Sequence, residues 1–184
     1  MSNNTNDYKL WWKAPLAFIV FITVLIVSKN SGSNENQKFG KKSDVCGFLN
    51  DEGIQTHKSK NPDVSQTHCL SDYIDLYSPD NDKMQNNIAY YVEGTESKIQ
   101  RLKVVANFYQ YPAPYSESKT LKIFETLVYK STGLKSFPQL KTAFEQRQSM
   151  NWTAKTAEGD KVADIKLVYD KWPSDGYEFK LVIE

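Results

Sequence analysis

An apolar run at residues 10–27 constrains this chain more than any other feature. It reads LWWKAPLAFIVFITVLIV, and its only charge is Lys13. At a helical rise of about 1.5 Å per residue the run would extend roughly 27 Å, close to the thickness of a bilayer's hydrocarbon core. Trp11 and Trp12 at one end suit the headgroup level. We therefore expect residues 10–27 to form a single-pass transmembrane signal-anchor helix.

A cleaved signal peptide is the alternative, because it would have a similar charged start and apolar stretch. Small residues at 31–33 offer a place for cleavage, although no A-x-A pattern precedes them. Orientation rests on competing signals. A count of flanking lysines favours a cytoplasmic domain, whereas the short N-terminal tail and two cysteines favour export. We expect an inner-membrane protein whose domain lies in the periplasm or otherwise outside the cytoplasm.

The composition divides the chain into a short tail at residues 1–9, the anchor, a flexible tether at residues 28–43 and a domain at residues 44–184. The tether is polar and rich in Ser, Asn, Gly and Lys. Of the chain's 23 basic and 22 acidic residues, two basic and one acidic residue precede the tether, which leaves 21 of each sign. A neutral domain lacks the basic surface that nucleic-acid binding requires. We therefore expect no nucleic-acid partner.

Helical signals occur in two parts of the domain. Asp44 can cap a short helix that Gly53 would end in a left-handed conformation, and apolar residues recur at helical spacing from Cys69. Further along, Ser116 can cap a helix that Gly133 would end, and Pro138 can start another. The expected helices therefore cover residues 45–52, roughly 65–77, 116–132 and a segment after Pro138.

Alternating apolar residues predict strands in two other parts. The segments 88–93 and 102–109 read as a hairpin, and the C-terminal segments near 152–156, 163–169 and 177–183 read as a three-stranded meander. The order is α-α-β-β-α-α-β-β-β, an α+β domain. We expect a five-stranded antiparallel sheet with the helices packed on one face.

The two cysteines form the first candidate site. In an exported domain, Cys46 and Cys69 are expected to form one disulfide, whereas in a cytosolic domain they would be two buried thiols. A zinc site that adds His57 and His68 is disfavoured, because the adjacent His68 and Cys69 make joint tetrahedral ligation awkward. We expect neither a metal nor a cofactor.

Signals for catalysis are weak. The chain contains no GxSxG, HExxH, P-loop or GxGxxG motif. Asp160 and Asp164 could form a carboxylate pair of the kind that glycoside hydrolases use, but they fall at a turn and on an outward strand face. We therefore expect a protein that is not an enzyme.

The aromatic segment at residues 107–118 is the best candidate binding surface. It reads NFYQYPAPYSES and places Tyr109, Tyr111 and Tyr115 around two prolines, between a strand and a helix. Aromatic side chains order at low entropic cost and often anchor interfaces. The alternative is that these rings fold back over the hydrophobic core.

These features favour a membrane-anchored envelope protein whose exported domain is a non-catalytic binding, scaffold or accessory module, for example in a secretion or conjugation system. Its partners would be the membrane, through residues 10–27, and another envelope protein. One alternative is an immunity protein that sequesters a periplasmic toxin, which predicts concentrated charge at the interface. Another is an envelope hydrolase, which predicts a cleft with perturbed acids.

Overall fold

The computed structural model of the chain describes residues 39, 45–60, 67–76, 85–94, 98–109 and 112–184. All of them belong to the unit Asn36–Glu184. The predicted anchor at residues 10–27 lies outside the described residues, and so does the tether except for Phe39, whose ring is buried in the core. No helix in the described part of the chain is long and apolar enough to cross a membrane.

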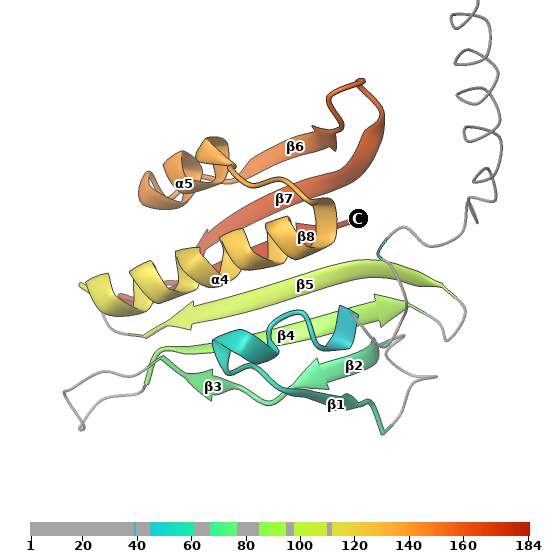
Figure 1. The fold of residues 1–184 in the computed structure, drawn as a ribbon. Helices are drawn as coiled ribbons and strands as arrows, with labels where there is room; N and C mark the ends of the chain where they lie inside the picture. The colour runs from blue at the N-terminus through green and yellow to red at the C-terminus, as the bar shows by residue number, and fades with distance from the viewer. Residues whose placement is uncertain (1–38, 40–44, 61–66, 77–84, 95–97, 110–111) are drawn as a thin grey trace, which may run out of the picture. The chain divides into compact units, whose positions relative to one another are not determined.

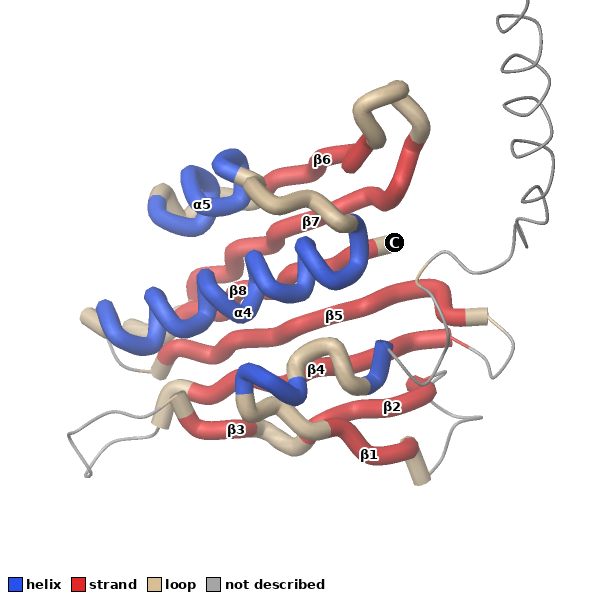
Figure 2. Tube along the Cα trace, in the orientation of Figure 1, coloured by secondary structure: helices blue, strands red, loops and turns tan. Residues whose placement is uncertain are grey.

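The domain is an α+β structure built on one antiparallel sheet (Figures 1 and 2). Its helical elements are the 3-10 turn η1 (Asn50–Glu52), α4 (Pro114–Thr132) and α5 (Pro138–Glu145). Its strands are β1 (Thr56–Lys58), β2 (Thr67–Ser71), β3 (Ile74–Asp75), β4 (Asn87–Gly94), β5 (Ile99–Phe108), β6 (Met150–Lys155), β7 (Lys161–Lys171) and β8 (Tyr177–Ile183).

Within the described residues the sheet has eight strands, seven in the order β1-β2-β4-β5-β8-β7-β6, and β3 pairs with β4 beside this path. Every pairing is antiparallel, including the β6-β7-β8 meander and the β4-β5 hairpin that the sequence predicted. Figure 1 shows α4 and α5 on the same side of the sheet. The segment before β1 lies on that side too, because Glu52 accepts hydrogen bonds from Lys122 and Thr126 of α4.

Apolar and polar side chains alternate along the strands, which explains why helices cover one side of the sheet. In β8, every second side chain is buried and belongs to the core: Tyr177, Phe179, Leu181 and Ile183. The facing stripe of α4 supplies Ile123, Phe124 and Leu127, all fully buried. Burying a large apolar side chain contributes about 1.5–3 kcal/mol, so the pairing of these two stripes accounts for much of the core's stability.

The predicted helix at residues 65–77 is wrong, because this region forms β2 and β3. Cys69 and Ser71 are buried on the helix-covered side, whereas Leu70 between them is only partly buried. The apolar residues that suggested a helix fit both periods, since a short run is ambiguous. Pairing with β4 favours the strand, because β4 offers an extended partner that a helix could not use.

The prediction of five strands was also wrong. Besides β2 and β3, the expected sheet lacked β1, whose sequence Thr-His-Lys has no apolar alternation. β1 forms through antiparallel pairing with β2, in which His57 lies opposite Leu70.

The continuous helix predicted over residues 45–52 is wrong, because backbone hydrogen bonds there, such as Phe48 N–H to the Val45 carbonyl, span three residues and the segment ends in the 3-10 turn η1. Gly53 and Gly133 adopt the expected left-handed conformation, with φ of 81° and 76°, and the helix stop at Gly133 is confirmed. However, α4 begins at Pro114, two residues before the expected cap Ser116.

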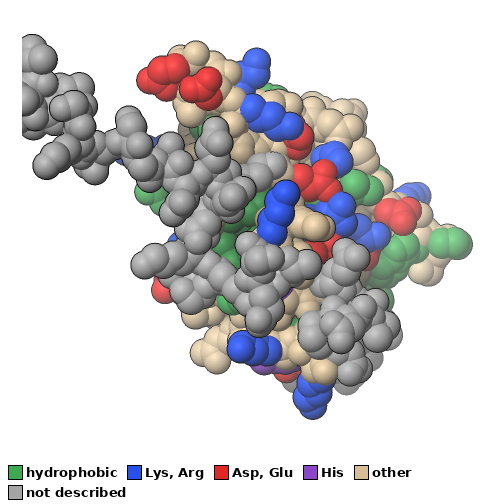
Figure 3. Space-filling model, turned by 90° about the vertical axis from the view of Figure 1, so that its right-hand side faces the viewer, with side chains coloured by type: hydrophobic (Ala, Val, Ile, Leu, Met, Phe, Trp, Pro, Cys, Tyr) green, Lys and Arg blue, Asp and Glu red, His purple; other side chains and the backbone are tan. Residues whose placement is uncertain are grey.

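The uncovered face of the sheet carries a row of paired charges near the C-terminal end of β8. Arg101 donates to Glu93 at 3.0 Å and to Glu184 at 2.7 Å, and Lys166 contacts Glu184 at 2.9 Å. Their sequence neighbours point into the core, so alternation places these side chains on the opposite face. Figure 3, viewed from this end of the sheet, shows acidic and basic side chains interspersed over the described surface.

We predict that Glu184 makes stability depend on pH at the acid end. Hydrogen bonds from Lys166 and then Arg101 hold the pKa of its carboxyl below the ordinary value of 4.5. A lowered folded-state pKa contributes its full stabilisation above the unfolded-state pKa, which lies near 4.5, and this contribution is lost as pH falls through the folded-state pKa. Urea unfolding would be measured at a series of pH values. Near neutral pH, the free energy of unfolding of wild type should exceed that of Glu184→Gln by up to about 1 kcal/mol.

This difference should shrink below about pH 4.5 and should also shrink at high salt, which screens partly exposed charges. The matched control is Glu145→Gln, since Glu145 is exposed and lies 3.9 Å from Lys141. A gap between wild type and Glu184→Gln that stays constant from neutral to acid pH would contradict the prediction.

Candidate functional site

The predicted tyrosine surface lies where β5 leads into α4. Tyr115 occupies the first turn of α4 and is 59% exposed, the largest exposed fraction among the described large hydrophobic side chains. Tyr109 directly follows β5 and is half-buried, and Tyr111 lies outside the described residues. The structure therefore brings Tyr109 and Tyr115 to the two ends of one short connection. A partner-binding role for the three tyrosines stays a prediction.

Trp172 packs against the predicted surface. Its ring centroid lies 5.1 Å from that of Tyr109, and it comes from the turn between β7 and β8. Gly176 makes this packing possible, because a Cβ at this position would lie 2.5 Å from the Trp172 ring and 2.8 Å from the Phe108 carbonyl oxygen. The Tyr109 ring therefore packs partly within the domain, in line with the alternative that these rings fold back over the core, whereas the Tyr115 side chain is exposed to solvent.

The side chain of Asn86 forms hydrogen bonds at both ends of the connection between β5 and α4. Its side-chain oxygen accepts a hydrogen bond from the Tyr109 backbone N–H at 2.8 Å, and its amide nitrogen donates to the Ser116 hydroxyl at 3.2 Å. Asn86 is only 1% exposed. A buried amide with both ends hydrogen-bonded is costly to displace, so it holds the strand exit and the helix start together.

Arg147, just after α5, also contacts the start of α4. Its Nη2 donates to Glu117 Oε1 at 2.7 Å, and its guanidinium lies 5.2 Å from the centroid of the Tyr177 ring. The Tyr177 hydroxyl donates to the same Glu117 oxygen. One carboxylate of α4 therefore joins the end of α5 to the first residue of β8.

The backbone of Arg147 adopts a strained conformation. Its φ is 52°, the only positive value among the described non-glycine residues. It follows the end of α5 and donates its N–H to the Phe144 carbonyl, at a position where glycine is usual. A left-handed residue with a Cβ costs about 1–2 kcal/mol, so the side-chain contacts to Glu117 and Tyr177 must offset that cost.

The chemistry of this cluster favours bracing over proton transfer. Burial, and then the hydrogen bond to Glu117, raises the pKa of Tyr177 above its ordinary value of 10.0. Its hydroxyl is therefore neutral near pH 7 and acts as a hydrogen-bond donor. Because Glu117 already accepts from both Tyr177 and Arg147, the arrangement is suited to holding α4, and with it Tyr115, in one position.

The structure places the other candidate residues apart from this surface. Asp164 accepts from Thr153 at 2.9 Å and from Lys161 at 2.5 Å on the uncovered sheet face, and Asp160 is exposed in the turn before β7. The described residues contain no group of three or more His, Cys, Asp or Glu side chains arranged to hold a metal ion.

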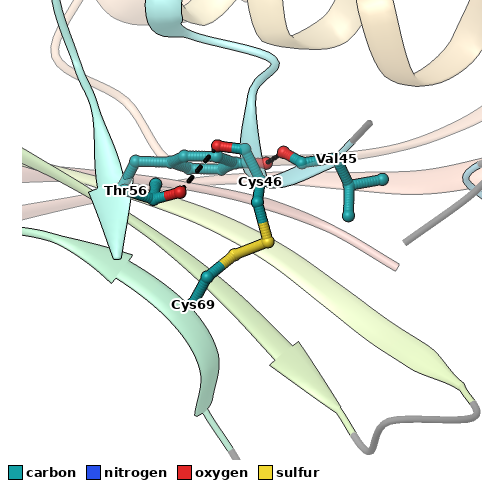
Figure 4. The surroundings of a disulfide bond; sticks show 5 residues. Val45, Cys46, Thr56 and Cys69 are labelled. Carbon is teal, nitrogen blue, oxygen red and sulfur yellow. Dashed lines mark hydrogen bonds between the residues drawn. A yellow bond between two sulfur atoms is a disulfide. The ribbon is translucent and has the colours of Figure 1, made fainter. Parts of the chain in front are cut away.

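Cys46 and Cys69, the pair expected to be joined, lie at disulfide distance, with their sulfurs 2.07 Å apart (Figure 4). The bond connects the segment before β1 to β2. Two hydrogen bonds of 2.8 Å reinforce it: Thr56 donates its hydroxyl to the Cys46 carbonyl, and the buried Tyr90 donates to the Val45 carbonyl. The start of the described domain is thus tied to the sheet.

Comparisons with protein-family models, curated proteins and solved structures found no match. A functional proposal for this chain therefore depends on its own residues. The sequence suggested Tyr109 and Tyr115 as contact residues, a role that stays a prediction, and it did not point to the contacts of Asn86, Arg147 and Trp172. Only the Trp172–Gly176 turn carried a local signal, the sequence Pro-Ser-Asp-Gly.

We predict that Arg147 and Glu117 are energetically coupled. Arg147→Gly should be about 1 kcal/mol more stable than Arg147→Ala, because glycine adopts the left-handed conformation without strain. A double-mutant cycle of Arg147→Ala with Glu117→Gln, followed by urea unfolding, should give a coupling energy of about 0.5–1.5 kcal/mol. Additive effects of the two substitutions would show that the ion pair does not offset the strain.

We also predict that the disulfide stabilises the N-terminal part of the domain selectively. Cys46 and Cys69 are 23 residues apart, and closing a loop of this size is worth about 3 kcal/mol in the chain-entropy model. The double variant Cys46→Ser, Cys69→Ser should lose about this free energy of unfolding. Hydrogen exchange should accelerate more in residues 45–58 than in β8, and reduced wild type should behave in the same way. Equal acceleration in both regions would contradict the prediction.

Proposed function

We propose that this chain is a non-catalytic binding module of a bacterial envelope system, held at the inner membrane by residues 10–27. The domain at residues 44–184 lies outside the cytoplasm and engages another envelope protein. The paired Cys46 and Cys69 support this placement, because structural disulfides persist in oxidising compartments. The tyrosine surface, defined as Tyr109, Tyr111 and Tyr115, is the contact region.

The exposure of Tyr115 on a braced helix is the observation that carries this proposal. A tyrosine loses little conformational entropy when it is ordered, and its hydroxyl can hydrogen-bond at the margin of an interface. Asn86 holds the start of α4 through Ser116, and Arg147 holds it through Glu117, so the ring is presented from a rigid position. Preorganisation of this kind lowers the entropic cost of binding.

We predict that Tyr115→Ala weakens partner recovery without loss of stability. Truncating an anchoring aromatic costs about 2 kcal/mol or more, roughly a 30-fold loss of affinity, whereas an exposed substitution changes stability by only about 0.5 kcal/mol. The full-length tagged chain would be purified from native membranes, and the recovered proteins compared between variants. Tyr111→Ala would be tested alongside.

Tyr129→Ala is the matched control. Tyr129 lies on the same helix and is 49% exposed, but it is near the opposite end of α4. Recovery of partners by Tyr115→Ala at the wild-type level would contradict the proposed surface, as would equal losses in both variants. Several envelope proteins recovered together would indicate a scaffold or accessory role, and a single toxin would instead indicate an immunity protein.

A further inference from the structure

The two cysteines of the disulfide differ in their access to solvent. Cys46 is half-buried in the segment before β1, whereas Cys69 in β2 is only 2% exposed. Strands lie on both sides of Cys69, which is opposite Lys58 of β1 and Val92 of β4. Figure 4 shows the bond running from Cys69 on its strand to the segment that carries Cys46. In the described part of the chain, a molecule that approaches from solvent therefore meets Cys46 before Cys69.

A hollow in the surface adjoins Cys46. It is lined by Cys46, Gly47, Asn50, Gln55 and Thr56, and Cys69 is not among these residues. Gly47 has no side chain, and the side chains of Asn50 and Gln55 are exposed rather than packed over the cysteine. The hollow therefore gives a thiol a route to one end of the disulfide only.

We propose that Cys46 is a thiol-exchange site, at which a dithiol opens the bond to Cys69. A thiolate of the dithiol attacks the Cys46 Sγ and forms a mixed disulfide, and the electron pair of the broken bond goes to the Cys69 Sγ, which takes up a proton. The second thiolate of the dithiol then attacks its own sulfur in the mixed disulfide, and Cys46 leaves and is protonated. The dithiol loses two electrons and two protons, and the chain gains them as two thiols.

The burial of Cys69 gives this exchange its direction. Apolar surroundings favour a neutral thiol over a thiolate, so released Cys69 is a weak nucleophile and returns slowly to the mixed disulfide. The same burial makes Cys69 a slow leaving group, so the bond persists unless a reactive thiolate occupies the hollow. Exchange at Cys46 is therefore selective for a thiol that fits beside it.

Opening the bond would change how firmly one edge of the sheet is held. Without it, the segment before β1 keeps only non-covalent contacts to β2 and β4, such as the hydrogen bond from Tyr90 to the Val45 carbonyl. β1 itself pairs with β2 over three residues. The redox state of Cys46 and Cys69 would thus control the stability of this edge. The inference uses neither the tyrosine surface nor residues 10–27, so it does not depend on the proposed function.

Mapping of early adducts on the full-length chain in detergent tests the inference, with 2-mercaptoethanol as the probe. After a quench with N-ethylmaleimide, peptide masses should show the probe on Cys46 and the maleimide on Cys69 in about tenfold excess over the reverse. Dithiothreitol should instead give two thiols without an accumulated adduct. Equal labelling of the two sulfurs, or a preference for Cys69, would overturn the inference. So would adduct formation that rises in step with unfolding as urea is added, because attack would then require the unfolded chain.

Gln55→Trp tests the hollow as the route, and His57→Trp is its matched control. Gln55 lines the hollow, whereas His57 is exposed on the next strand position but one and does not line it. Gln55→Trp should slow adduct formation on Cys46 about threefold or more, because the larger side chain occupies the approach, and His57→Trp should react at the wild-type rate. Urea unfolding of the oxidised proteins checks that both variants fold. A wild-type rate in folded Gln55→Trp, or equal slowing in both variants, would overturn the assignment.

Discussion

Burial of one face of the antiparallel sheet is the constraint on which the rest of the domain depends. Tyr177, Phe179, Leu181 and Ile183 of β8 pack on this face, with α4 and α5 on the same side. Large apolar side chains contribute most of the favourable free energy, and alternation sends every second one to the same side. No described helix covers the other face, which carries ion pairs such as Arg101 with Glu184.

The polar contacts near the tyrosine surface have a different role from the core. Asn86 and the Arg147–Glu117 pair do not create the fold, but they set where α4 begins relative to β5 and β8. Each is satisfied within the domain, so these groups hold the helix rather than attract a ligand. The strained backbone of Arg147 fits this role, because strain persists only where surrounding contacts offset it.

Sequence reasoning succeeded where local pattern and tertiary packing agree. The C-terminal meander, the β4-β5 hairpin and the stop of α4 at Gly133 were all predicted from spacing and turn residues. It failed at β2 and β3, where a short apolar run fits both helix and strand and pairing with β4 decided the outcome. Aromatic content suggested Tyr109 and Tyr115 as contact residues, which stays a prediction, whereas no sequence pattern pointed to the hydrogen bonds that Asn86 makes to Tyr109 and Ser116.

That β5, β7 and β8 are strands, that β8 buries one face, and that α4 ends at Gly133 could all be predicted from the amino-acid sequence. These features depend on residues close together in the chain, whose period and conformational freedom can be read directly. The tertiary structure alone decided that residues 67–75 are extended, that Asn86 joins Tyr109 to Ser116, and that β6 forms the sheet's edge. Strand pairing and the satisfaction of buried polar groups join residues far apart in sequence, so no local pattern specifies them.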